Sequence, residues 1–151
     1  MVVIVGSNIY SETWNLLYSL ISGNITEPAI ISPARTGSRW IVGAFPDVEG
    51  KDFAGYPIVV VENAEKSTMK EGFSTSGINT NEISVSVYAY SKAPRELNIL
   101  SEDISDAVLS NRSVLALSGF TLTSMDNGIQ GADLIGNSRI HFREQIIRGM
   151  V

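Results

Sequence analysis

The chain has 151 residues, with 11 Lys and Arg against 16 Asp and Glu and no cysteine, so its formal net charge is −5. This length suits one domain, over residues 1–151, that buries about two thirds of the surface of the unfolded chain. The lack of cysteine excludes a disulfide framework and a thiol nucleophile, and the acidic balance disfavours a nucleic-acid surface. Only 18% of the residues are charged, against about 25% in an ordinary soluble domain. Part of the outer surface is therefore neutral or apolar, as in a subunit of an assembly.

Nothing in the sequence is typical of a membrane-spanning or exported chain. No run approaches 18 consecutive apolar residues, the length that a membrane span needs. The apolar segment at residues 1–6 is too short for a signal peptide and follows no basic residues. We therefore expect no membrane partner.

The first element is predicted to be a helix. Large apolar side chains recur at positions i, i+3, i+4 and i+7, namely Trp14, Leu17, Tyr18 and Ile21. Ser11 is a candidate N-cap and Gly23 a candidate stop, which gives about three turns. Residues 24–55 follow with many prolines and glycines and one pattern typical of a strand, at residues 39–45.

Two strands with different patterns come next. Residues 56–62 form a short unbroken apolar run, which is typical of a strand covered on both faces. Residues 82–90 alternate strictly, with Ile83 among the apolar side chains of one face. The other face carries Tyr88 and Tyr90 and no charge between residues 83 and 90, a composition suited to an interface as well as to a solvated sheet.

A second helix is predicted to open at Pro94, because proline is tolerated at the first helical position. Its buried stripe consists of Leu97, Leu100, Ile104, Ala107 and Val108. Glu102, Asp103 and Asp106 lie off that stripe, as expected of a solvated helix face.

The last third of the chain predicts two more strands, at residues 120–124 and 137–148. Between them, the turn signal Asp-Asn-Gly at residues 126–128 opens a glycine-rich connection. In the last strand, Arg139, His141 and Arg143 alternate with apolar residues and share one face, and Arg148 follows near its end. We leave two interpretations open: a solvated face, or a salt-bridge surface for the acidic residues of a neighbouring copy.

The predicted order of elements is α-β-β-β-α-β-β. It indicates an α+β domain: a mainly antiparallel sheet of four to five strands with two helices packed on one face. Three long loops, around residues 24–38, 64–81 and 126–137, are candidates for interaction surfaces. The second of these loops contains Lys66, Lys70 and Phe73.

Motifs for catalysis and cofactor binding are weak. A metal-dependent nuclease would need two carboxylates and a lysine, but Asp47 and Glu49 are only two residues apart, and with Glu62 as the second acid no lysine follows at the required spacing. A phosphate loop at residues 43–52 has the wrong spacing and an Asp where Ser or Thr would hold magnesium. His141 is the only histidine, and the arginines on its face disfavour metal binding. We expect no catalytic residue, metal or cofactor.

The order of elements resembles that of the tail terminator, or tail completion, proteins of long-tailed bacteriophages and related viruses. The stretch that carries the resemblance best is residues 83–109, where an alternating strand runs through Ser91 and Pro94 into a helix with Asn98 and Leu100. A Phe-Pro-Asp turn at residues 45–47 also matches, and the resemblance covers nearly the whole chain.

This resemblance implies a virion protein, assembled in the host cytoplasm, that forms a homo-oligomeric ring, commonly a hexamer. The ring would bind the head-proximal end of the tail tube, stop tube polymerisation and offer a docking face to the head-closure protein of the neck. The genome would pass through its lumen without sequence-specific binding. A ring also requires two different complementary patches on each subunit. Two alternatives remain: another neck component, such as a head-closure or connector protein, and a small metal-dependent nuclease.

Overall fold

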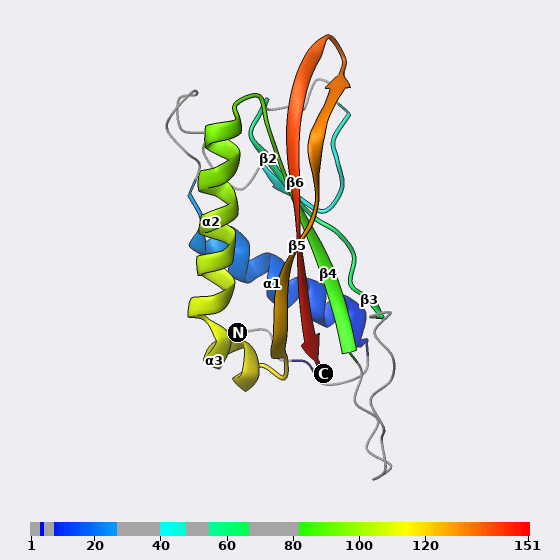
Figure 1. The fold of residues 1–151 in the computed structure, drawn as a ribbon. Coiled ribbons are helices and arrows are strands. Elements are labelled where there is room, and N and C mark those ends of the chain that lie inside the picture. The colour runs from blue at the N-terminus through cyan, green and yellow to red at the C-terminus, as the bar shows by residue number, and fades with distance from the viewer. Residues whose placement is uncertain (1–3, 5–7, 27–39, 48–54, 67–81) are drawn as a thin grey trace.

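The computed structural model describes residue 4 and residues 8–26, 40–47, 55–66 and 82–151. It contains three helices and a six-stranded mixed sheet, so the predicted α+β class is confirmed (Figure 1). The sheet has one strand more than the upper end of the prediction, and the order of elements gains a fourth strand before the second helix and a short third helix after it.

The first helix, α1 (Ile9–Asn24), begins before its predicted N-cap. The cap is Asn8, whose side chain accepts a hydrogen bond from the backbone N–H of Ser11, so Ser11 lies within the first turn. Trp14 Nε1 donates a hydrogen bond of 2.9 Å to the carbonyl oxygen of Val61, and the Tyr18 hydroxyl donates one of 2.8 Å to that of Ile41. These two bonds fasten the helix to the sheet.

The second helix, α2 (Pro94–Ser110), has the predicted start and the predicted buried stripe. A short helix that the sequence patterns did not indicate, α3 (Arg112–Leu117), follows after Asn111. Gln145 Nε2 of the last strand donates to the carbonyl oxygen of Ser101 and to the hydroxyl of Ser105. These two hydrogen bonds connect α2 with the centre of the sheet.

The sheet order is β1-β2-β4-β6-β5, and β3 pairs separately with β4; the last two strands are β5 (Thr121–Ile135) and β6 (Ser138–Met150). The first three strands are short: β1 (Ile41–Val42), β2 (Ile58–Val61) and β3 (Glu65–Lys66). The long β4 (Glu82–Ser91) pairs antiparallel with β2, β3 and β6, whereas β1 and β2 are parallel. Within the described residues 40–45 of the predicted strand at 39–45, only Ile41–Val42 form a strand. The predicted loop at 64–81 contains the strand β3 near its start. Residues 67–81 lie outside the described residues.

The largest correction concerns the glycine-rich loop predicted at 126–137. In its place, β5 (Thr121–Ile135) continues to a two-residue turn and pairs along its length with β6 (Ser138–Met150). The Asp-Asn-Gly signal lies at a bulge, where Gly128 and Ile129 oppose the single residue Glu144. The turn itself is at residues 136–137, and Gly136 has φ 64°, the left-handed conformation that such a turn requires.

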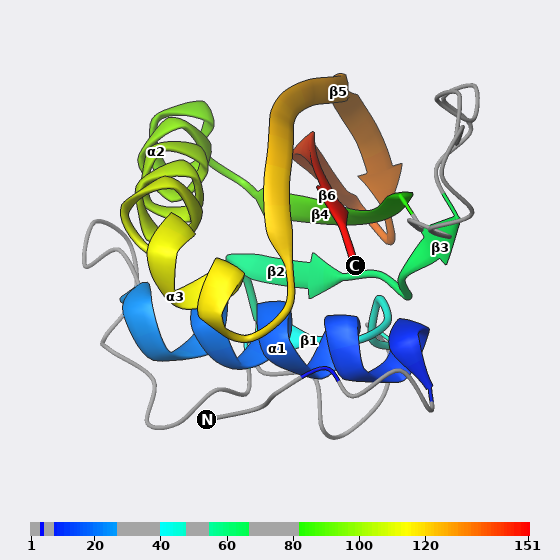
Figure 2. The ribbon, with the colours of Figure 1, turned by 90° about the horizontal axis from the view of Figure 1, so that it is seen from below.

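Both long helices pack on one face of the sheet, as predicted (Figure 2). The alternation of β4 is confirmed, because Ile83, Val85, Val87 and Ala89 are all buried, and the last three contribute to the same core as the helices. All four residues of β2 are buried, as its unbroken apolar run predicted. The Tyr88 face points away from this core, since successive strand residues alternate between the two faces.

Candidate functional site

The β5–β6 hairpin projects beyond the sheet (Figure 1). The last residue of β4, Ser91, pairs with His141, so residues 133–140 pair only with each other. We call this segment the arm. Leu134 in the arm is 75% exposed, and Ile129 near its base is 64% exposed. The arm therefore presents the exposed Leu134 where no other described strand pairs with it, whereas Ile140 of the arm is fully buried.

A pocket of about 390 Å³ lies where the base of the arm meets the N-terminal end of α2. Arg139, His141 and Arg143 line it from one face of β6, and Pro94, Leu97 and Asn98 are among the other lining residues. Among the described residues that line this pocket none is acidic. The side-chain Nε of Arg143 is buried and has no hydrogen-bond partner. We call this site the basic pocket.

The arginines near the end of the chain lie on two different faces of the sheet. Arg139 and Arg143 share one side of β6 with Gln145, which faces α2; Arg139 is exposed and Arg143 is half-buried. Arg148 is an odd number of residues away from Arg139 and Arg143 along β6. It lies across from Ser84 and forms an ion pair with Asp126 of β5. Because strand side chains alternate, Arg148 belongs to the other face of the sheet and is already paired.

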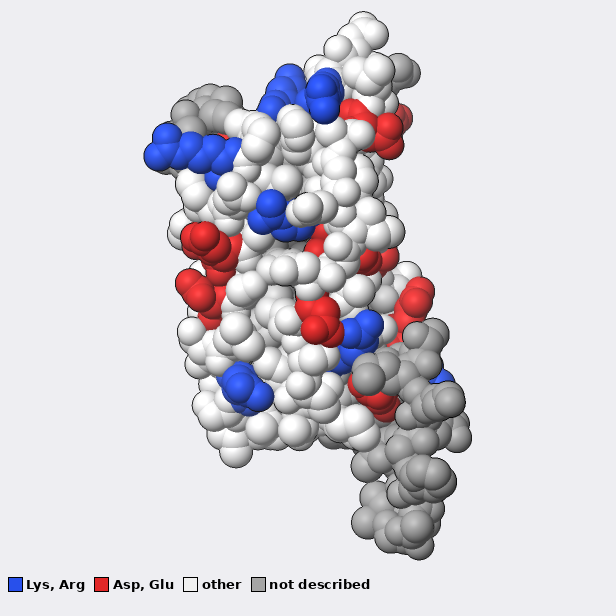
Figure 3. All heavy atoms as spheres, viewed as in Figure 1, with Lys and Arg blue, Asp and Glu red and all other residues white. Residues whose placement is uncertain are grey.

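The acidic row of α2, namely Glu102, Asp103 and Asp106, lies outside the buried stripe as predicted. Glu102 and Asp106 are exposed and Asp103 is half-buried. Burial raises the pKa of Asp103, and the negative charges of Asp106 and Glu102 raise it further. Within the part of the chain that the structure describes, no ion pair joins this row to a basic group. Figure 3 shows acidic atoms along the outer flank of α2 and basic atoms around its N-terminal end and the base of the arm.

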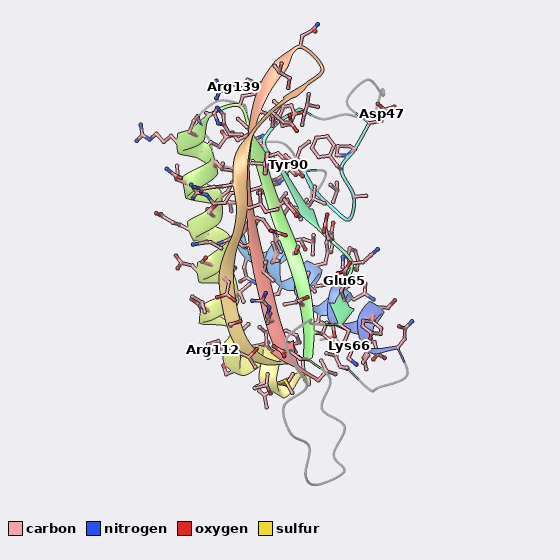
Figure 4. The ribbon with its side chains drawn as sticks, turned by 45° about the vertical axis from the view of Figure 1, so that its right-hand side comes forward. Asp47, Glu65, Lys66, Tyr90, Arg112 and Arg139 are labelled. Atoms are coloured by element: carbon pink, nitrogen blue, oxygen red, sulfur yellow. The ribbon has the colours of Figure 1, made fainter. Side chains whose placement is uncertain are left out.

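The face of the sheet opposite the long helices carries aromatic side chains. Tyr90 lies 4.7 Å from Phe45 between ring centroids and 6.1 Å from both Tyr88 and Phe142. Tyr88, Tyr90 and Phe142 are half-buried, and Phe45 is 36% exposed. Figure 4 labels Tyr90 and Arg139 toward the arm, and Glu65, Lys66 and Arg112 toward the other end of the molecule. We call this surface the aromatic face.

A buried carboxylate that the sequence patterns did not indicate, Glu144, lies on the same side of the sheet as the aromatic face. Glu144 is 7% exposed and accepts hydrogen bonds from the backbone N–H of Ile129 and from the hydroxyls of Tyr88 and Ser86. Burial raises its pKa, but these three bonds together lower it by more, so the pKa lies below the ordinary value. An acid among apolar residues of the same strand face was the signal that could have revealed it.

Glu144 affects the titration of its neighbours on the same face. The pKa of Glu62 is raised by burial and then by the charges of Glu144 and Glu65. The pKa of Tyr88 is raised above its usual range by burial and by its hydrogen bond to Glu144. These interactions make the aromatic face a neutral to acidic surface whose hydroxyls keep their protons.

The remaining predicted site residues have separate locations. Lys66 is exposed on β3, whereas Lys70, Phe73 and Glu49 lie outside the described residues. Within the described ranges, no three His, Cys, Asp or Glu side chains gather as a metal site would require, and Asp47 and Glu62 belong to no such group.

The chain was also compared with known proteins. No protein-family model matches it, and no curated protein matches it significantly. Across the described residues, no helix combines the length and the apolar character needed to span a membrane. The features of the molecule that bear on function are the arm, the basic pocket, the acidic row and the aromatic face.

Proposed function

We propose that this chain is a tail terminator subunit of a long-tailed bacteriophage or related virus. Copies form a ring, commonly a hexamer, on the head-proximal end of the tail tube. The ring ends tube growth and offers a docking face to the head-closure protein. Such a role needs no covalent chemistry, so the surfaces that contact partners are its functional residues.

The observation that carries this proposal is the arm. Residues 133–140 extend past the end of β4, and Leu134 remains exposed on them. A segment that projects from its own sheet is suited to lie against a neighbouring subunit, where its apolar side chains lose contact with water. A ring of identical subunits joins two different patches at each interface, and an arm that reaches one neighbour provides one of these patches.

The aromatic face supports the second part of the proposal. Tyrosine and phenylalanine are enriched in protein interfaces because they bury a large area for few rotatable bonds. Tyr88, Tyr90 and Phe142 form such a surface on the side of the sheet away from the long helices. We assign this surface to contact with the tail tube or the neck. A ring bound there ends tube growth because its outer surface does not repeat the tube surface it covers.

The proposal is tested by the oligomeric state of the full chain, alone and with the tube protein. Mass photometry and negative-stain electron microscopy should detect rings that cap tubes at one end. Leu134→Ser should reduce ring formation. Leu117→Ser is the matched control, because Leu117 is 78% exposed but lies at the end of α3 and outside the arm. A chain that stays monomeric in both conditions refutes the proposal.

The alternative neck function has a distinct outcome in the same system. Tails assembled without a terminator have tubes of uncontrolled length. Tails assembled without a head-closure or connector protein have normal length but do not join heads. Electron microscopy of tails made with and without this chain therefore separates the two functions, and tubes of normal length without it would contradict a terminator.

A further inference from the structure

The strongest unassigned feature is the combination of the basic pocket and the acidic row. We propose that the basic pocket of each subunit receives the acidic row of α2 from a second copy, so that ion pairs at the base of the arm hold neighbouring subunits together. This inference rests on the proposed ring and names the contact that closes it.

The charge of the pocket argues for an anionic occupant. The whole chain has a net charge of −5, yet two arginines and the single histidine converge here, and none of the described lining residues is acidic. Arg139 is exposed and His141 and Arg143 are half-buried, so these basic side chains are open to a partner from outside the subunit. Arginine is the residue best suited to pair with carboxylates in interfaces. A carboxylate from a second copy would balance this concentration of positive charge.

The acidic row lacks positive charges to balance its own. Its three carboxylates lie within two turns of α2, and repulsion from Glu102 and Asp106 contributes to the raised pKa of Asp103. No ion pair within the described chain compensates this repulsion. A cationic surface from another copy would remove it, and the negative charges would then favour association rather than oppose the fold.

The spacing of the two patches is compatible. Glu102 and Asp106 are four residues apart, a rise of about 6 Å along a helix. The basic side chains of the pocket occur at every second residue of β6, at Arg139, His141 and Arg143. Neighbouring members are therefore separated by about 7 Å along the strand. Two carboxylates one turn apart can therefore face neighbouring members of this series together. Because pocket and row are different patches of one subunit, their contact is heterologous, the kind of contact that a closed ring requires.

Charge reversal at exposed positions tests the contact without disturbing the core. Arg139→Glu places a negative charge at the pocket, and Glu102→Arg with Asp106→Arg makes the row positive; all three residues are exposed. Each change alone sets like charges against each other and should weaken subunit association at least about tenfold. Arg112→Glu is the matched control, because Arg112 is also exposed but lies at the opposite end of the molecule (Figure 4).

Combination of the changes gives the decisive result. A chain with all three substitutions has reversed the exposed charges of both patches and should form rings again. An equimolar mixture of the two reversed variants should do the same, since each supplies the patch that the other needs. Mass photometry over a range of salt concentrations measures both results, and added salt should weaken association.

The outcomes separate the two proposals. If the unmodified chain forms no ring with or without the tube protein, the proposed function fails and this contact fails with it. If it forms rings and the reversed variants do so equally well, only the contact is wrong. Reversed variants that keep the ring but no longer bind the tube would also overturn the inference, because the pocket would then face the tube rather than a second copy.

Discussion

Glu144 of β6 accepts a hydrogen bond of 3.1 Å from the backbone N–H of Ile129, which lies in the bulge of β5. A bulge leaves a residue outside the regular ladder, and here a carboxylate supplies the acceptor for its N–H. The same carboxylate binds the hydroxyls of Tyr88 and Ser86. One side chain thereby connects the bulge at the base of the arm with the aromatic face.

Glu144→Gln should destabilise the fold by about 1 to 3 kcal/mol at pH 7, because it removes charge-assisted hydrogen bonds to a buried group. The pKa of Glu144 is lowered in the folded state, so its stabilisation is complete above the unfolded pKa and is lost as pH falls through the folded pKa. Urea unfolding of both proteins should therefore give a difference that narrows below about pH 4. A difference that widens in acid would contradict this assignment.

Asp103→Asn should stabilise the isolated subunit and weaken the ring. The folded pKa of Asp103 is raised, so its charge opposes folding at pH 7, and this penalty disappears as pH falls through the folded pKa. Removal of the charge should gain a few tenths of a kcal/mol, about the size of a helix charge pair. Thermal unfolding at dilutions where the chain is monomeric measures this gain, which should shrink with salt. Mass photometry should show weaker association for the same variant, and tighter association would count against the proposed contact.

Gly149→Ala should be strongly destabilising although it adds one methyl group. A Cβ at Gly149 would lie 2.3 Å from Cζ of Phe120, whose ring is fully buried. Overpacking of this kind costs about 1 to 3 kcal/mol or more. Gly23→Ala is the control, because Gly23 lies in α1 and a Cβ there meets nothing within 4 Å. Alanine should stabilise that helix by up to about 1 kcal/mol. Equal losses in denaturant unfolding would refute this account.

Gly136→Val should loosen the arm without unfolding the sheet. Gly136 has φ 64° at the hairpin turn, a conformation that costs an ordinary residue about 1 to 2 kcal/mol and that asparagine tolerates better. Hydrogen exchange should become faster at the backbone amides of residues 133–140 in the valine variant, and less so in Gly136→Asn. Exchange in β4 should not change, because the arm does not pair with it.

The sequence pattern was sufficient to predict an element where the apolar residues of a single segment repeat at the helix or strand period. The strict alternation of residues 82–90 predicted β4 and its buried face, and the stripe from Leu97 to Val108 predicted α2. The unbroken apolar run predicted that β2 is buried on both faces. The acidic row of α2 followed from the same stripe, since residues off a buried stripe face outward.

Turn signals were less reliable, because a segment with a turn sequence can still pair with a neighbouring strand and form a bulge there. The Asp-Asn-Gly sequence at residues 126–128 is a strong turn signal, yet pairing with β6 and the carboxylate of Glu144 accommodate it as a bulge. The residues of the predicted loop therefore belong to the second part of β5 and to the turn that follows it. The energetic reason is that continued pairing satisfies more backbone groups than a loop in the same place.

By itself, the sequence determined the α+β class, the two main helices, the alternating strand and the outward position of the acidic row, because these depend on periodicity within one segment. Only the tertiary structure decided that Arg139 and Arg143 form a pocket with α2, that Arg148 pairs with Asp126 on the other face, and that Glu144 binds the bulge. Those relationships depend on strand register and on which face the helices cover, and both are settled by pairing between segments far apart in the chain.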